Sequence, residues 1–244
     1  MESFLCKTPK IYSFIRLVAG SKDWEKKTFI ESIKPGWSVI EIGANQGYFT
    51  SLFQKLVGRN GIVHAFEPIP STFKLLEKSV ASNPRNCFLH NLGSAEKNLD
   101  LIEFYLPAND SGQATMSPHT SDSWQNQEIH KVVCKVVRLD DFKPIKSLKK
   151  INFIKIDAEG AELPSLKGAK TLLAKHKPIL FFEGCKEWMN SFGYTPREID
   201  QFLQSLNYNN LQVVEKKPTR IHSLENFFNN KSVEASFNFL AKES

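Results

Sequence analysis

The chain has 244 residues, of which 41% are hydrophobic and 24% are charged, and its formal net charge is +6. These values exclude a disordered or collagen-like chain and allow a hydrophobic core that needs no disulfide. No apolar stretch approaches the roughly 20 residues that span a bilayer, and Lys7, Lys10 and Arg16 interrupt any apolar leader. The four cysteines are far apart, so we expect a cytoplasmic protein with reduced thiols and without a membrane span.

Residues 1–35 carry apolar side chains at helical spacing and end at the turn signal Pro35-Gly36. We therefore expect a helical extension over residues 1–36 and one domain over residues 37–244. Within that domain short apolar strands alternate with amphipathic helices, which predicts an α/β fold with a parallel sheet covered on both faces. The strands are predicted at 39–42, 62–66, 87–92, 152–156, 179–182, 211–214 and 237–240, and the helices at 48–57, 73–80, 163–173 and 196–206.

One stretch breaks this alternation. Residues 99–106 and 131–139 are both strand-like, and residues 107–130 between them are polar and rich in turn residues. Long segments of this kind are more often functional lids or disordered than plain connections. We expect residues 107–130 to form a polar insertion that acts as a lid over the acceptor.

The basic residues are mostly dispersed along the chain. The densest group consists of Lys143, Lys146, Lys149, Lys150 and Lys155. A group of lysines before a strand is typical of a solvated loop, and this is how we interpret it.

The first strand of the domain ends in Glu41-Ile42-Gly43-Ala44-Asn45-Gln46-Gly47. Glycines at a strand-to-helix turn let the backbone pass close to a ligand. The dinucleotide fingerprint G-x-G-x-x-G is not met, because Asn45 replaces its second glycine and Tyr48 its third. An acidic residue before the glycines repels a pyrophosphate but can pair with an ammonium group.

The second strand ends in Phe66-Glu67-Pro68. A carboxylate at this position of a doubly wound sheet can accept hydrogen bonds from both ribose hydroxyls of an adenosine group. The two strand ends together indicate a ligand with an amino group and a ribose but no pyrophosphate. S-adenosylmethionine meets these conditions, with S-adenosylhomocysteine as the product.

Four stretches resemble the FkbM family of S-adenosylmethionine-dependent methyltransferases. They are residues 39–47, residues 65–68, Arg138-Leu139-Asp140-Asp141-Phe142, and the segment Ile154-Lys155-Ile156-Asp157-Ala158-Glu159-Gly160-Ala161-Glu162 with its continuation at 166–169. The family usually has Asp where Glu41 stands.

This resemblance implies a class I methyltransferase fold with a seven-stranded sheet, parallel except for its last strand. It also implies O-methylation of a small molecule, a sugar or a secondary metabolite. The cofactor site is expected to comprise Glu41, Gly43, Ala44, Asn45, Gly47, Tyr48, Glu67, Pro68 and Asp157.

A hydroxyl acceptor has to lose a proton as it takes the methyl group, so a general base is expected near the methyl. Asp157 and Glu159 follow one predicted strand and Glu183 ends the next, so their side chains should share one crevice. His119, in the polar insertion, is a further candidate. Asp157 and Glu183 could instead bind Mg²⁺ or Ca²⁺, but the sequence shows no third oxygen ligand, and we expect no metal.

Two other functions stay open at this point. Methylation of ribose hydroxyls in RNA is compatible with the net positive charge, although the Pro-Pro and Pro-Cys dipeptides of base-directed methyltransferases do not occur. A scaffold that binds the cofactor without catalysis is the other alternative. The sequence names neither the acceptor nor the oligomeric state.

Overall fold

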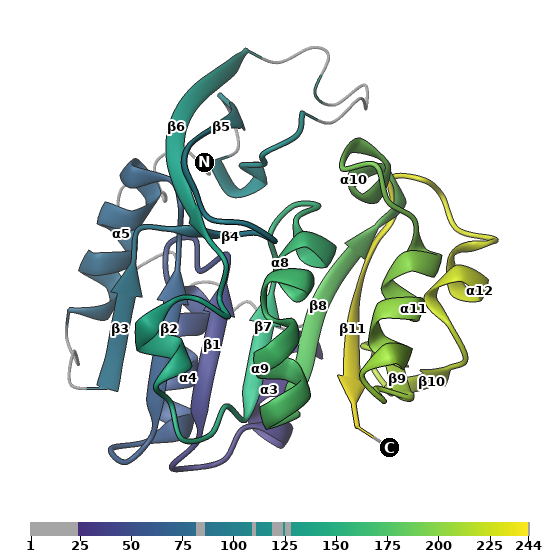
Figure 1. The fold of residues 1–244 in the computed structure, drawn as a ribbon, viewed down its shortest axis with the longest axis horizontal. Coiled ribbons are helices and arrows are strands. Elements are labelled where there is room, and N and C mark those ends of the chain that lie inside the picture. Colours follow the sequence, from purple (N-terminus) through teal and green to yellow (C-terminus); the bar gives the residue numbers. More distant parts are fainter. Residues whose placement is uncertain (1–23, 82–85, 109–110, 119–123, 125–127, 244) are drawn as a thin grey trace.

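The computed structural model describes residues 24–81, 86–108, 111–118, 124 and 128–243. Its centre is an eight-stranded sheet in the order β10-β9-β11-β8-β7-β1-β2-β3 (Figure 1). Parallel pairings join β3 (Cys87–His90), β2 (Ile62–Phe66), β1 (Ser38–Ile42), β7 (Phe153–Ile156) and β8 (Ile179–Cys185). Antiparallel pairings join β8 to β11 (Ser236–Lys242), β11 to β9 (Asn210–Val213), and β9 to β10 (Thr219–Ile221).

The predicted α/β class and mostly parallel sheet are confirmed, but the predicted number of seven strands is wrong. The additional strand is β10, which pairs with β9 at the edge of the sheet. Two of its three residues, Thr219 and Arg220, are exposed. An edge strand that buries so little carries no run of apolar residues, and therefore it gives no signal in the sequence.

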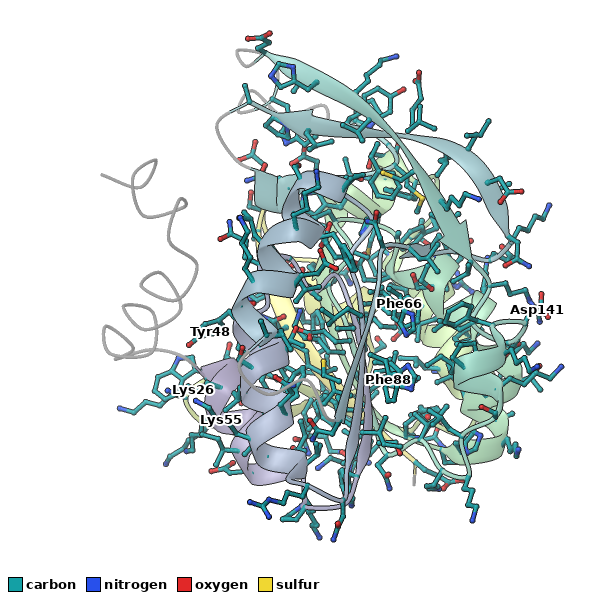
Figure 2. All side chains as sticks on the ribbon, turned by 90° about the vertical axis from the view of Figure 1, so that its left-hand side faces the viewer. Lys26, Tyr48, Lys55, Phe66, Phe88 and Asp141 are labelled. Atoms are coloured by element: carbon teal, nitrogen blue, oxygen red, sulfur yellow. The ribbon has the colours of Figure 1, made fainter. Side chains whose placement is uncertain are left out.

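Helices cover both faces of the sheet, because the strands bury side chains on each. On one face α3 (Trp24–Ser32), α4 (Tyr48–Val57) and α5 (Pro70–Val80) pack on residues such as Val39, Phe153 and Ala65. On the other face α7 (Lys143–Lys146), α8 (Glu162–Gly168), α9 (Lys170–His176), α10 (Lys186–Ser191), α11 (Pro196–Ser205) and α12 (Leu224–Phe228) surround a larger core. Figure 2 shows the sheet from its edge, with Tyr48 of α4 on one side and Asp141 on the other.

The segment predicted as one helix over 163–173 consists of two helices, α8 and α9. The break falls at Ala169, after which Asp140 accepts backbone hydrogen bonds from Thr171 (3.0 Å) and Leu172 (2.9 Å). A carboxylate that binds the free amides of a first turn starts a new helix. The capping box at Thr195 and Glu198, predicted for the next helix, is confirmed.

A second, three-stranded sheet lies at the end of the main sheet toward which β8 runs (Figure 1). Its order is β4 (Gly93–Ser94), β6 (Ile129–Val137) and β5 (Leu99–Pro107), so the two predicted strand-like segments pair with each other. The short 3₁₀ helix η2 (Ser111–Gln113) follows β5. Of the predicted helical extension, α3 is described, while residues 1–23 lie outside the described part.

Candidate functional site

A cavity of about 260 Å³ opens where the carboxyl ends of β1, β2, β7 and β8 meet. Seven residues predicted from the sequence line it: Gly43, Asn45, Glu67, Pro68, Asp157, Glu159 and Glu183. The sequence pattern did not reveal Glu25 of α3, Phe49 of α4, Phe104 of β5 and Met116 of the insertion. Apolar periodicity marks these elements, but it does not show which of their side chains face the cavity.

Gly43 allows the β1–α4 turn to pass the end of β7. Its φ is +78°, and a Cβ atom at this position would lie 1.7 Å from the backbone oxygen of Asp157. Any side chain would push these two segments apart. The glycine therefore brings the turn and Asp157 to the same cavity.

Asn45 and Glu67 hold each other in place. Asn45 has a φ of 48°, a conformation that asparagine tolerates, and its backbone N–H donates to Glu67 Oε2 at 2.9 Å. The other carboxyl oxygen of Glu67 accepts from the backbone N–H of Ile69, also at 2.9 Å. Burial raises the pKa of Glu67 to about 7. Asn45 Oδ1 is buried and has no hydrogen-bond partner among the described residues, so a ligand that donates a hydrogen bond can satisfy it.

Glu41 does not line the cavity. It is buried at the α4 face of the sheet, accepts a 2.6 Å hydrogen bond from the hydroxyl of Thr50, and stands opposite Lys155 in the β1–β7 register. Burial raises the pKa of Glu41 to about 7, against the opposing effects of Lys155 and Thr50. Its contact with an amino group of the cofactor stays a prediction.

Three further residues predicted for the cofactor, Ala44, Gly47 and Tyr48, are also not among the residues that line the cavity. Gly47 has a φ of +86°, and a Cβ atom there would lie 2.3 Å from Ser79 Oγ and 2.7 Å from Leu76, both of α5, so the glycine allows the turn to pack closely on this helix. Tyr48 lies with Lys26 and Lys55 on the α4 side of the molecule (Figure 2). These roles in cofactor binding likewise stay predictions.

Lys155 is not a solvated residue, and its interpretation as part of a surface lysine group is wrong. Its side chain is 2% exposed, and Nζ donates to Asp157 Oδ2 at 2.8 Å. The ammonium also lies 5.4 Å from the ring centroid of Phe49. The lysine belongs to β7, and its side chain enters the layer between sheet and helices, where a charge needs a partner.

Asp157, Glu159 and Glu183 come together as predicted. Each offers one carboxylate oxygen, and these oxygens lie within 4.8 Å of one another. Burial and the neighbouring Asp157 raise the pKa of Glu183 well above its usual range. Ser236 of β11 donates a hydrogen bond to Glu183. Glu159 supplies the third oxygen ligand that the sequence did not reveal. The lack of a third ligand is therefore no longer an argument against a bound cation.

The turn that carries Glu159 is tied down from several sides. Glu162, buried and with a pKa raised to about 7 by burial, accepts the backbone N–H groups of Ala158 (2.9 Å) and Gly160 (3.4 Å). Thr115, from the polar insertion, donates its hydroxyl to the Glu159 carbonyl at 2.7 Å. The insertion is therefore bonded directly to this turn. His119, the other predicted base, lies outside the described residues.

The family profile of the FkbM methyltransferase domain matches residues 41–209. The chain belongs to this family. It is 32% identical over 143 residues to Methyltransferase 1 of Beauveria bassiana (strain ARSEF 2860), covering 53% of this chain and 57% of that protein. It is 29% identical over 157 residues to Methyltransferase sdnD of Sordaria araneosa, covering 53% and 59%. The chain thus matches little more than half the length of these relatives.

Solved structures with the same fold have low sequence identity. The methyltransferase FkbM from Methylobacillus flagellatus KT superposes with a TM-score of 0.51 at 16% identity, over 95% of this chain and 53% of that one. A SAM-dependent O-methyltransferase from Thermotoga maritima gives 0.51 at 13% identity, over 91% and 66%. The family and the class I fold expected from the sequence are confirmed.

The cavity fits S-adenosylmethionine. Glu67, predicted to accept hydrogen bonds from the ribose, lines the cavity, and the buried Asn45 Oδ1 has no hydrogen-bond donor among the described residues. The charged side chains that line the cavity among the described residues are all acidic: Glu25, Glu67, Asp157, Glu159 and Glu183. Such walls suit a cationic sulfonium with an ammonium group.

Proposed function

We propose that this chain transfers the methyl group of S-adenosylmethionine to a hydroxyl of a small molecule, a sugar or a secondary metabolite. One observation carries the proposal. A single cavity contains both Glu67, the predicted ribose-binding residue, and the cluster of carboxylates formed by Asp157, Glu159 and Glu183. The cofactor supplies an activated methyl group. The chain has to orient the acceptor, exclude water and accept a proton.

Each part of the cavity has a role in this reaction. Glu67, with the turn that it orders, holds the ribose, and the acidic walls favour the cationic form of the cofactor over the neutral product. Phe104, Ala114 and Met116 offer an apolar wall on the side of the insertion. A carboxylate of the cluster accepts the proton of the hydroxyl as its oxygen attacks the methyl carbon.

RNA is a poorer acceptor for this cavity. Although the whole chain has a net charge of +6, the described residues that line the cavity include no lysine, arginine or histidine. A ribose hydroxyl would bring its neighbouring phosphates against carboxylates, which costs free energy at short distance. A neutral or cationic acceptor avoids this repulsion.

A methyl-transfer assay on the purified chain tests the proposal. Radiolabelled S-adenosylmethionine is offered with neutral sugars, polyols and phenols, with single-stranded RNA, or with no acceptor. We expect methylated product with a small hydroxyl compound and none with RNA. Transfer to RNA overturns the choice of acceptor. Binding of S-adenosylhomocysteine without turnover of any acceptor identifies a scaffold.

A further inference from the structure

The buried Lys155 is a charged group beside the cavity that the proposed reaction does not yet use, and it carries a positive charge. Its side chain is 2% exposed, whereas that of Asp157, to which it donates at 2.8 Å, is 33% exposed. The ammonium therefore reaches Asp157 from inside the protein, and the carboxylate forms the boundary between this ammonium and the cavity.

Several neighbours fix the position of Lys155. In the strand register it stands between Glu41 of β1 and Phe181 of β8, and the ring of Phe49 covers its ammonium. Glu41 is itself held by the hydroxyl of Thr50. An ammonium packed in this way has little freedom, so it fixes the carboxylate that it binds.

Glu183 differs from Asp157 in its surroundings. Its neighbours are the hydroxyl of Ser236 and the carboxyl groups of Asp157, Glu159 and Glu162, none of them cationic, and it stands opposite Asn238 in the β8–β11 register. Two adjacent carboxyls do not both ionise easily, and a cation beside one of them decides which keeps the charge. Here the cation is beside Asp157, so the exchangeable proton belongs to Glu183.

Resting on the proposed function, we propose that Lys155 is a positioning residue that holds Asp157 as a fixed carboxylate, and that Glu183 is the catalytic residue that takes the proton of the acceptor. The hydroxyl proton passes to the ionised Glu183 carboxylate while the acceptor oxygen forms its bond to the methyl carbon. The carbon–sulfur bond breaks, and its electron pair stays on sulfur. Asp157 keeps its charge throughout, because the ammonium makes it the weaker base.

The contact between Lys155 and Asp157 can be tested without an acceptor. In protein labelled with ¹⁵N-lysine, a buried and hydrogen-bonded ammonium exchanges slowly enough to give a resonance, which the Lys155→Met variant identifies by its loss. We expect this resonance to shift in Asp157→Asn and to stay in place in Lys177→Met, whose ammonium binds the Leu206 carbonyl near the start of β8. A resonance that is unchanged in Asp157→Asn overturns the positioning role.

Turnover of the acceptor found in the transfer assay tests the catalytic part. Glu183→Gln should lower kcat by about 10²–10⁴-fold, the usual contribution of a general base, with S-adenosylhomocysteine affinity close to that of the wild type. Lys155→Met should lower kcat more than tenfold. The double variant Lys155→Met/Asp157→Asn should have the same kcat as Asp157→Asn alone, because Lys155 acts through Asp157.

The outcomes separate this proposal from the proposed function. A double variant with a lower kcat than Asp157→Asn shows that Lys155 acts on the structure and not through Asp157, and it overturns the proposal. The double variant removes both charges, so this comparison holds even where Lys155→Met alone does not fold. If Glu159→Gln lowers kcat by the factor expected for loss of the general base and Glu183→Gln does not, Glu159 accepts the proton and the proposal is overturned. If the wild type turns over no acceptor, the proposed function and the role of Glu183 as base are both overturned. The resonance of the Lys155 ammonium still shows whether Lys155 positions Asp157.

Discussion

The carboxylate of Glu67 orders a turn, and we predict that it also binds the ribose of the cofactor. Its two oxygens accept from the backbone of Asn45 and Ile69, and the side chain lines the cavity. A carboxylate has lone pairs for further donors, such as ribose hydroxyls.

We expect Glu67→Ala to weaken the binding of S-adenosylhomocysteine by about 1.5–3 kcal/mol, the range for hydrogen bonds that involve a charged group. Calorimetric titration of the purified variant measures this. Glu77→Ala, which removes an exposed carboxylate from α5, serves as the matched control and should bind like the wild type. Equal affinities in both variants would remove Glu67 from the cofactor site.

The carboxylates of Asp157, Glu159 and Glu183 are close enough to hold a cation. However, the Lys155 ammonium already binds Asp157 at 2.8 Å, and its charge repels a cation bound to the same carboxylate.

We therefore expect methyl transfer to survive exhaustive chelation. Mg²⁺ or Ca²⁺ titrated into protein saturated with S-adenosylhomocysteine should give no specific heat of binding. Activity that disappears with the chelator and returns with either ion would make the three carboxylates ligands. The variant Lys155→Met provides the internal comparison, because loss of the ammonium should make the cluster a better cation site.

Among the elements, α9 depends on a side chain from outside its own sequence. Asp140 is buried, accepts from the first-turn amides of Thr171 and Leu172, and pairs with Arg138 at 2.9 Å. Its neighbour Asp141 pairs with the same arginine but is about half exposed.

Asp140→Ala should lower the free energy of unfolding by about 1–3 kcal/mol, because it leaves two helix amides without their acceptor and removes one of the two ion pairs of Arg138. Asp141→Ala should lower it by no more than about 1 kcal/mol, as usual for an exposed ion pair. Urea unfolding of both variants makes the comparison. If both variants lose a similar free energy of unfolding, Asp140 does not stabilise the protein by capping α9.

The polar insertion reaches the site through Thr115, which is fully buried and donates to the Glu159 carbonyl at 2.7 Å. We expect Thr115→Val, which keeps the shape and removes the hydroxyl, to lower methyl transfer at least tenfold. The affinity for S-adenosylhomocysteine should change little, because Glu67 and Asn45 lie at the other part of the cavity. A loss of cofactor affinity in a folded variant would assign the insertion to the cofactor site.

Much of this arrangement could be predicted from the sequence, because apolar periodicity defines the strands and parallel strands end at one edge. These two regularities are enough to predict that Glu67, Asp157 and Glu183 share one crevice. They do not place Glu25 or Met116, whose approach to the cavity depends on how α3 and the insertion fold back. Lys155 is missed for another reason: it follows four lysines of a predicted loop in the sequence, and only its position inside a strand of a sheet covered on both faces indicates that it is buried.

At the scale of the whole molecule, two histidines and three buried glutamates have opposite effects on how the free energy of unfolding depends on pH. His64 and His90 form a 2.9 Å hydrogen-bonded pair, and burial lowers the pKa of each to about 4. Burial raises the pKa values of Glu41, Glu67 and Glu162 to about 7. Relative to the unfolded chain, the folded protein binds fewer protons at the histidines and more at the carboxyls.

The signs follow from linkage. The histidines contribute stability that is fully present above pH 6.5, their value in the unfolded chain, and is lost as the pH falls toward 4. The carboxyls contribute stability that is fully present below pH 4.5 and is lost as the pH rises through 7. Between pH 4.5 and 6.5 the two effects largely offset each other.

In a variant without the two histidines, the pH dependence of the free energy of unfolding should therefore reflect the three carboxyl groups. Aromatic rings surround the pair, and phenylalanine at both positions removes donor and acceptor together, so His64→Phe/His90→Phe should fold. We expect the difference in unfolding free energy, variant minus wild type, to increase by about 1–3 kcal/mol as the pH falls from 6.5 to 4. Urea unfolding of ligand-free protein across this range measures the difference, and the exposed His222→Phe is the control. A difference that does not change with pH would show that the pair takes up protons in the folded protein as readily as in the unfolded chain.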